Sequence, residues 1–414
     1  MKKQRYPVGI DLGTTFSSLA YVNEAGQPQV IRFTDDDSSI AATSYSIASA
    51  IYFQSESEVV VGNRALDFAL LDPLRVARVF KRQMGEPEYR REVGRDTYET
   101  FEVEGRCYRP EELSAMVLRR LKETAESQLG PIQDVVVSVP YVFDEVRRRA
   151  TQDAAKIAGF VNVDLVDEPV AAAMAFGHTL FRGLEEQKTF DDEALSYIYD
   201  DRVILVYDLG GGTFDATLMR LGRDGVFEVL ATAGDWRLGG EDWDNILLGI
   251  LCEKVQSLTG SDPRNEPALL QELWLKAVQA KQTLSEKPRA EVVFFHNEDE
   301  HTIVLTRGDF QRESRHLLAR TSDTISEMFA RADIQWNVVE CVVIVGGASR
   351  MPMVREHLEN VSKRGHLDMS LSPDTAIAKG AALFAAMNSG QTLTSGIKDV
   401  ETVNSHPLGL LVKD

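Results

Sequence analysis

Short apolar runs alternate with longer segments of helical periodicity along most of this 414-residue sequence. Continuous apolar runs, which are typical of buried strands, lie at 135–139, 163–166, 203–207 and 341–345. Apolar residues at helical spacing predict helices over 110–129, 144–157, 170–176, 269–284, 310–331, 353–358 and 375–387. Residues 17–22 and 29–33 read as a hairpin around a turn at 24–28. This alternation predicts an α/β architecture with parallel sheet elements.

Two stretches of the chain, 8–15 and 206–213, have nearly the same pattern: an apolar strand, an aspartate, a glycine turn and a threonine. Their aspartates are Asp11 and Asp208, and a third glycine corner follows the strand 341–345. Glycines let backbone N–H groups approach a phosphate closely. The repeat therefore predicts two related halves that close on one nucleotide.

Asp11 and Asp208 are expected to face each other across the cleft between these halves. Two carboxylates beside a triphosphate can hold Mg²⁺ directly or through its waters, because Mg²⁺ prefers oxygen ligands. The threonines and glycines of the corners would offer hydroxyl and N–H groups to phosphate oxygens. Neither a Walker loop nor a dinucleotide fingerprint is present in the sequence.

Composition narrows the possible partners and the compartment. The length favours two or more structural units, and the apolar fraction of 43% is ordinary for a globular protein. A net charge of −19 opposes binding to nucleic acid or to an anionic membrane. Three scattered cysteines fit a reducing compartment, and no signal peptide or membrane span is apparent. We therefore expect a cytoplasmic protein.

These motifs resemble the nucleotide-binding domain of the seventy-kilodalton heat-shock chaperones, within the actin and sugar-kinase superfamily. The resemblance covers about 6–390 and rests on four motifs, at 9–15, 167–173, 208–215 and 346–352. It implies an actin-like ATPase fold. In this fold two lobes, each with a ribonuclease-H-like core and an appended subdomain, enclose the nucleotide in a central cleft.

The resemblance also implies domain boundaries. Lobe I would span 1–180, with an appended subdomain at 38–110 and a closing helix at 369–388. Lobe II would span 181–368, with an appended subdomain at 235–307. Residues 389–414 would be an interdomain linker and the start of a substrate-binding domain that lies outside this sequence.

Site residues follow from the same resemblance. The catalytic residues would be Lys81, Glu168, Asp208, Asp11 and Thr213. ATP or ADP would contact Gly13, Thr14, Thr15, Gly210, Gly211, Gly212, Thr213, Gly239, Lys281, Ser285, Gly346, Gly347, Ala348, Arg350 and Asp374. The metal-binding residues, for Mg²⁺ and a monovalent cation such as K⁺, would be Asp11, Asp208 and Asp215. Pro140 and Arg148 match the residues that relay the nucleotide state to the partner domain.

By resemblance, the partners would be unfolded polypeptide clients, a J-domain co-chaperone and a nucleotide-exchange factor. Three alternatives remain open: a sugar kinase of the same superfamily, an actin-like filament and a nucleotide sensor that hydrolyses weakly. A sugar kinase would require a base aspartate in a sugar pocket, and no motif for one is present.

The sequence departs from the family pattern in three places. Val278 replaces the acid that binds the ribose, and Gln282 replaces the arginine that stacks on adenine, so we expect weaker ATP binding. The acidic stretch 178–201 is expected to be an irregular surface excursion. In the linker, Glu401 stands in an apolar run; we expect it to stay exposed and to weaken docking of the linker.

Overall fold

The two halves of the molecule are built around two mixed sheets. The computed structural model describes residues 6–34, 43–69, 71–94, 97–186, 201–222, 224–297, 299–362, 367–391, 393 and 397–401. We call residues 6–186 the first half and residues 201–401 the second half. The first sheet has the order β15-β14-β1-β2-β3, with β6 also paired to β2, and the second has the order β22-β21-β16-β17-β18-β23.

The strands of the first sheet are β1 (Val8–Asp11), β2 (Phe16–Val22), β3 (Pro28–Val30), β6 (Ile47–Ala48), β14 (Asp134–Val139) and β15 (Asn162–Asp167). Those of the second sheet are β16 (Arg202–Leu209), β17 (Phe214–Leu221), β18 (Val226–Asp235), β21 (Cys341–Val345), β22 (Leu367–Asp368) and β23 (Asp399–Glu401). In each sheet the aspartate-bearing strand has a parallel neighbour on one side and an antiparallel neighbour on the other. The strand order thus repeats, as the duplicated motif predicts.

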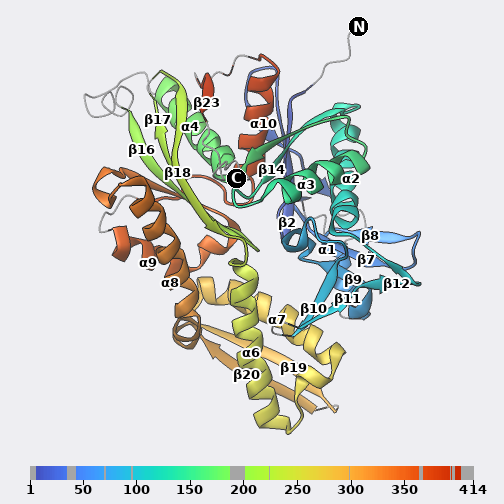
Figure 1. Ribbon diagram of the computed structural model, residues 1–414. Helices are drawn as coiled ribbons and strands as arrows, with labels where there is room; N and C mark the ends of the chain where they lie inside the picture. Colours follow the sequence, from blue (N-terminus) through green and yellow to red (C-terminus); the bar gives the residue numbers. More distant parts are fainter. Residues whose placement is uncertain are drawn as a thin grey trace, which may run out of the picture.

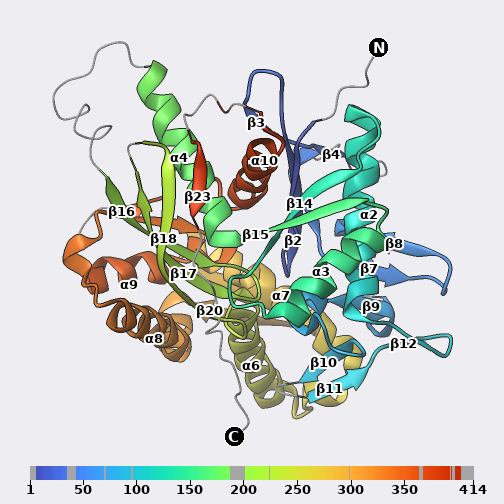
Figure 2. The same ribbon diagram turned by 45° about the horizontal axis from the view of Figure 1, so that its top comes forward.

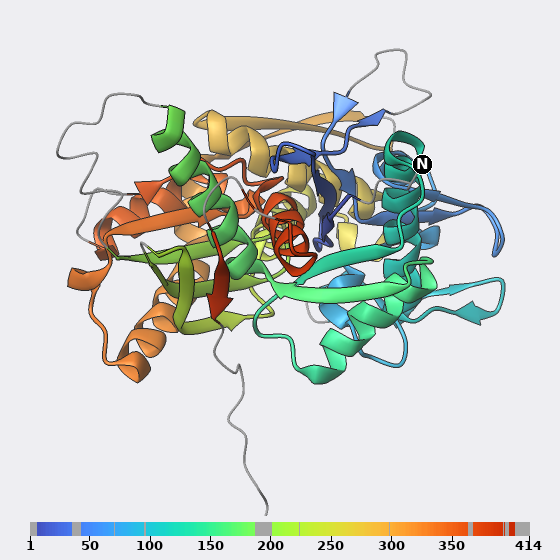
Figure 3. The same ribbon diagram turned by 90° about the horizontal axis from the view of Figure 1, so that it is seen from above.

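Two central helices, α4 (Glu168–Glu186) and α10 (Ala376–Asn388), lie between the sheets (Figure 3). Helix α10 packs on β1, β2 and β14, and α4 packs on β16 and β17. Small residues permit this close packing: a Cβ on Gly9 would lie 2.0 Å from the Ala382 nitrogen, and one on Gly380 would lie 1.7 Å from the Ala171 oxygen. Any larger side chain at either glycine would force the elements apart.

Other helices cover the outer faces of the two sheets. Helices α2 (Pro110–Leu129) and α3 (Glu145–Ile157) pack on the first sheet, and α8 (Arg307–Ala332) packs on β17 and β18 of the second, with α9 (Pro352–Ser362) beside it. The Asp144 carboxylate accepts a hydrogen bond from the Arg147 N–H, which explains why α3 begins there. None of the helices in the described ranges is long and apolar enough to cross a membrane.

Each half carries an additional unit (Figure 1). In the first half it contains β4 (Phe33–Thr34), β5 (Thr43–Ser44), β7 (Ala50–Phe53), β8 (Val59–Val61), α1 (Asn63–Phe68), β9 (Val76–Arg78), β10 (Arg90–Gly94), β11 (Thr97–Thr100), β12 (Glu102–Val103) and β13 (Arg106–Cys107). In the second half it contains α6 (Gly240–Thr259), α7 (Pro267–Glu286), β19 (Arg289–His296) and β20 (Asp299–Thr306). Short 3₁₀ turns are η1 (Pro73–Arg75), η2 (Phe80–Gln83), η3 (Pro263–Asn265), η4 (Trp336–Val338) and η5 (Gly347–Arg350).

Two predictions about element boundaries are wrong. The closing helix, which the resemblance placed at 369–388, begins only at Ala376, because Pro373 disfavours helical geometry in the residue before it; the helical spacing, which predicts 375–387, is confirmed. The stretch expected to be irregular from residue 178 continues as α4 to Glu186, and Leu180 packs against the core between the sheets. The rest of that acidic stretch, 187–200, lies outside the described residues.

The linker segment is docked, contrary to expectation (Figure 2). Strand β23 pairs in parallel with β18, so that Val400 lies opposite Phe227. Ile397 is buried and Val400 packs against the core between the sheets, whereas Glu401 is exposed, as predicted. The backbone ladder and two apolar side chains hold the segment, so Glu401 does not need to be buried.

Candidate functional site

The glycine corners of the two halves lie against each other. A Cβ on Gly211 would lie 1.9 Å from Thr15 Oγ1, and one on Gly212 would lie 2.4 Å from Thr14 Oγ1. The third corner joins them, because a Cβ on Gly346 would lie 2.5 Å from an Asp208 carboxylate oxygen. The corners, which lie more than about a hundred residues apart in the sequence, thus form one site, with no room for a side chain at Gly211, Gly212 or Gly346.

The first residues of α6 hold the glycine corner of the second half in place; we call this corner, Gly210 to Gly212, the second glycine loop. The N–H groups of Gly240 and Glu241 donate to the carbonyls of Gly210 and Gly211, both at 2.9 Å. No described residue accepts a hydrogen bond from the N–H groups of Gly211 or Gly212. Successive backbone N–H groups without a protein acceptor form a concave site that suits an anionic ligand.

Two serines that the sequence did not indicate support the glycine corner around Gly13, which we call the first glycine loop. The Gly13 N–H donates to Ser17 Oγ at 3.1 Å, and Ser49 Oγ donates to the Gly13 carbonyl at 2.7 Å. The two hydroxyls are 2.9 Å apart and buried. Nothing in the sequence marked Ser49, because it reaches the loop from 36 residues away.

Buried carboxylates gather beneath the loops. Burial, followed by the Glu168 carboxylate, raises the pKa of Asp11 to about 7, although Lys81 lowers it. Burial and the charges of Glu168, Asp215 and Asp11 raise the pKa of Asp208 well above its ordinary value. Burial and Glu168 also raise the pKa of Asp215. The charges of Asp11 and Asp215 thus both act on Asp208, so the structure gathers the three predicted metal-binding aspartates in one cluster.

Lys81 supplies a buried positive charge in this acidic cluster. It lies on η2, is 4% exposed, and its Nζ is 2.5 Å from Glu168 Oε1. Glu168 begins α4, where the helix dipole favours a negative charge. The lysine thus points into the site rather than into solvent, which the sequence pattern alone could not distinguish.

The carboxylates suit a hydrated divalent cation better than a closed cage of protein ligands. Among the described residues, no group of three or more histidine, cysteine or acidic side chains is arranged to enclose a metal ion. Neither Asp215 oxygen makes a hydrogen bond of normal geometry to a described residue, although the Val142 N–H is close enough to lower its pKa. Mg²⁺ usually keeps several waters and takes one or two carboxylates together with substrate phosphates. The residues therefore fit Mg²⁺ held jointly with a nucleotide.

Comparison with known proteins identifies the family of this chain. Residues 7–413 match the family model described as Hsp70 protein. This chain belongs to the Hsp70 family. The chaperone protein DnaK of Metamycoplasma hominis is 34% identical over an alignment of 414 positions, and this alignment covers 98% of this chain. The chain spans 62% of the length of that relative.

Two of the residues that the Hsp70 resemblance predicts at the nucleotide, Lys281 and Ala348, lie near the start of α6. A Cβ on Gly240 would lie 3.2 Å from both Ala348 Cβ and Lys281 Nζ. Lys281 Nζ also donates to Asp244 at 2.7 Å and to the Gly240 carbonyl at 3.0 Å. Burial raises the pKa of Asp244 to about 6 even beside this lysine. Lys281 is thus held inside the second half.

The other predicted nucleoside contacts form a more exposed group. Arg350 Nη2 is 2.6 Å from Asp374 Oδ2, and both side chains are exposed. Ser285 Oγ donates to the Lys281 carbonyl within α7. A Cβ on Gly347 would meet no atom within 4 Å. On α7, Val278 is half-buried and Gln282 is exposed, so neither offers a charged group to a ribose or a base.

Arg148, the expected relay residue of this Hsp70 family member, connects α3 to the end of β15. Its Nη2 is 2.5 Å from Asp167 Oδ1, and its Nε donates to the Phe143 carbonyl at 2.9 Å. Asp167 directly precedes Glu168, and burial raises its pKa. The contacts of Arg148 therefore join 143–148 to the residue directly before the acid that pairs with Lys81.

Proposed function

We propose that this chain binds ATP with Mg²⁺ between its two halves and transfers the terminal phosphoryl group to water. The observation that carries the proposal is the convergence of three glycine corners, Lys81 and a cluster of four acids at one place. Phosphoryl transfer needs alignment and charge neutralisation more than covalent chemistry. The site supplies both.

Each group would have a defined role. Backbone N–H groups of Gly211, Gly212 and Thr14 would hold phosphate oxygens, and Thr213 would add its hydroxyl. Lys81 would place its positive charge on the terminal phosphate and the attacking water, with Glu168 holding the lysine in position. Asp11 and Asp208 would hold Mg²⁺, which when bound would supply charge neutralisation for the phosphates. Asp215 would hold a monovalent cation such as K⁺ beside them.

We infer that the two halves are the lobes of an actin-like ATPase fold. The repeated strand order supports this inference, and α4 and α10 between the sheets would form the joint. ATP hydrolysis would alter the relative position of the lobes. The docked strand β23 would carry that change to a substrate-binding domain beyond this sequence, and thereby to unfolded clients, a J-domain co-chaperone and an exchange factor.

Single-turnover cleavage of ATP tests the proposal. Lys81→Ala and Asp208→Asn should each lower the cleavage rate by at least about a hundredfold, the usual effect of removing charge stabilisation from a transition state. Asp153→Asn, at an exposed acid on α3, is the matched control and should leave the rate unchanged. Equal rates in all four proteins would refute the assigned catalysis.

A weakly hydrolysing sensor is the second candidate, because Val278 and Gln282 lack the charged groups expected at the nucleoside. A sensor would bind ATP in a calorimeter but show the same slow cleavage in wild type and Lys81→Ala. Phosphorylated sugar after incubation with ATP and a panel of sugars would instead identify a kinase.

A further inference from the structure

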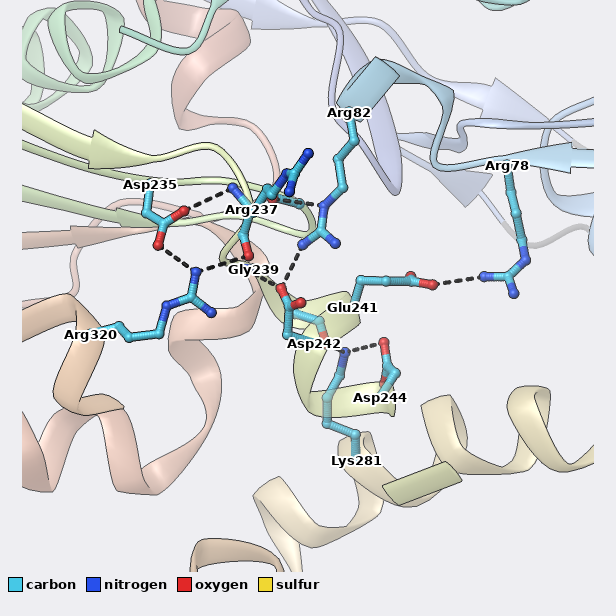
Figure 4. A network of polar contacts seen from close by, with 12 residues as sticks. Arg78, Arg82, Asp235, Arg237, Gly239, Glu241, Asp242, Asp244, Lys281 and Arg320 are labelled. Carbon is cyan, nitrogen blue, oxygen red and sulfur yellow. Dashed lines mark hydrogen bonds and ion pairs between the residues drawn. The ribbon is translucent and has the colours of Figure 1, made fainter. Parts of the chain in front are cut away.

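Arg78 connects the two halves across the site. Its backbone belongs to β9 in the first half, whereas its guanidinium lies on two residues of the second half. Arg78 Nη1 is 2.9 Å from Glu241 Oε1 (Figure 4), and its Cζ lies 3.3 Å from the centre of the Trp274 ring. Glu241 is 5% exposed and Trp274 is 8% exposed. A cation on a desolvated indole is at the strong end of the cation–π range.

The backbone of Arg78 is fixed in the first half. The Tyr89 hydroxyl donates to the Arg78 carbonyl at 2.7 Å and accepts from the Arg78 N–H at 3.3 Å. Strand β9 also pairs with β7, with Arg78 opposite Ala50. Because these contacts fix β9, we expect that a movement of the guanidinium would change the backbone after Arg78 and leave the strand before it in place.

A strained turn and the buried lysine follow Arg78 directly. Val79 has a φ of 61°, in the left-handed region that a β-branched residue rarely adopts. Lys81 comes two residues later, and Arg82 follows it. Strained backbone persists only where surrounding contacts determine it; here Tyr89 holds the Arg78 backbone from the first half, and the Arg78 and Arg82 side chains contact the second half.

Arg82 provides the second attachment of this turn. Its Nη2 is 2.6 Å from Asp242 Oδ2, and its Nε donates to the Gly212 carbonyl at 2.9 Å (Figure 4). Glu241 and Asp242 are adjacent residues in the first turn of α6. The N–H groups of Gly240 and Glu241 in the same turn donate to the second glycine loop. The turn of Lys81 and the second glycine loop thus share one support.

We propose that Arg78 is a positioning residue for Lys81 and depends on contact between the halves. Seated on Trp274 and Glu241, Arg78 fixes the Val79 turn and thereby keeps Lys81 beside Glu168. When α6 and α7 separate from the first half, Arg78 loses both partners, the turn relaxes and Lys81 leaves its position. Cleavage of ATP is then possible only with the halves closed. This inference rests on the proposed ATPase function.

Four variants test the inference by single-turnover cleavage and by ATP affinity. Arg78→Gln and Trp274→Leu should each lower the cleavage rate about tenfold, in keeping with loss of a buried cation–π contact. The dissociation constant for ATP should change less than about threefold, because neither residue belongs to the glycine loops. Trp274→Phe keeps an aromatic face and should restore most of the rate. The double variant Arg78→Gln/Trp274→Leu should be no slower than the slower single variant.

Arg106 offers a matched control within the first half. It pairs with Glu56 and Glu112 and lies 4.7 Å from the centre of the Tyr108 ring, so it has the same kinds of contact without spanning the halves. Arg106→Gln should cleave ATP at the wild-type rate. A tenfold loss in this control, or a loss of ATP affinity that matches the loss of rate in Arg78→Gln, would overturn the inference in favour of general destabilisation. Wild-type rates in both single variants would also overturn it.

A second measurement separates failure of this inference from failure of the ATPase proposal. Acrylamide quenching of tryptophan fluorescence, without nucleotide, should increase in Arg78→Gln because Trp274 loses its cover. The increase should be absent when Arg78→Gln is made in a Trp274→Phe background. Unchanged quenching would show that the contact does not hold the halves together, whether or not the wild type cleaves ATP.

Discussion

The buried aspartate cluster makes a prediction about stability that requires no enzymatic assay. Asp11→Asn should stabilise the nucleotide-free protein at pH 8, because it removes a charge that burial and Glu168 make unfavourable. An asparagine oxygen can still accept the hydrogen bond that Ser138 Oγ donates to Asp11 at 3.2 Å. The substitution therefore tests charge with little change of shape.

The magnitude follows from the pKa of Asp11. Its rise from 3.8 to about 7 corresponds to an upper bound of about 4 kcal/mol. The folded state then holds a proton that the unfolded state has lost between these pH values. Stability of the wild type should therefore fall as the pH rises from about 4 to about 7. The advantage of Asp11→Asn should shrink by about 1.4 kcal/mol per pH unit between pH 7 and pH 4.

Urea titrations at pH 8, 6 and 5 measure this difference, with and without magnesium and ATP. The nucleotide complex should stabilise the wild type more than Asp11→Asn, since only the wild type offers the carboxylate to Mg²⁺. Asp153→Asn, which alters an exposed acid, should change stability by less than about 0.5 kcal/mol at every pH. Lower stability of Asp11→Asn at pH 8 without nucleotide would show that Asp11 is not destabilised by its surroundings, and the reasoning would fail.

Three further predictions concern the site. Val79→Asn should raise the free energy of unfolding by about 1 kcal/mol, because asparagine tolerates the left-handed backbone better than valine; a lower urea midpoint would contradict this. Gly211→Ala should abolish ATP binding in a calorimeter, since its Cβ would overlap Thr15 Oγ1, and wild-type affinity would show that the loops separate at no cost. Val278→Glu combined with Gln282→Arg should tighten ATP binding about tenfold by supplying charged partners, whereas unchanged affinity would remove these positions from the nucleoside site.

Much of the fold could be predicted because its signals are local. Apolar runs and helical spacing gave the strands β14 and β21 and the helices α2 and α3 to within a residue or two. The end of α4 was missed because the acidic composition of 178–201 indicates an irregular surface segment, whereas Leu180 packs against the core between the sheets. The docking of 399–401 was missed because it depends on backbone pairing with β18, which side-chain pattern does not report.

The site divides in the same way. The glycine corners and their aspartates repeat in sequence, so their meeting at one place could be predicted. Ser49, Arg78 and Trp274 could not be found, since each acts on residues far away in the chain. An arginine before a lysine is ordinarily a solvated charge, and only the fold reveals that Arg78 lies on Trp274 in the other half.

The charges at the interface of the halves act in opposite directions. Arg78 and Arg82 of the first half pair with Glu241 and Asp242 of the second, and these contacts favour closure. The aspartates beneath the glycine loops come from both halves: burial is the main cause of their raised pKa values, and the charge of Asp11 adds to the rise for Asp208 across the halves, so this repulsion favours opening. Lys81 offsets only part of that charge, because Glu168 already holds it at 2.5 Å. A divalent cation would relieve the repulsion without affecting the arginine pairs. Its arrival with a nucleotide would therefore shift the balance toward closure, and its loss would shift the balance back, with the same ion pairs present throughout.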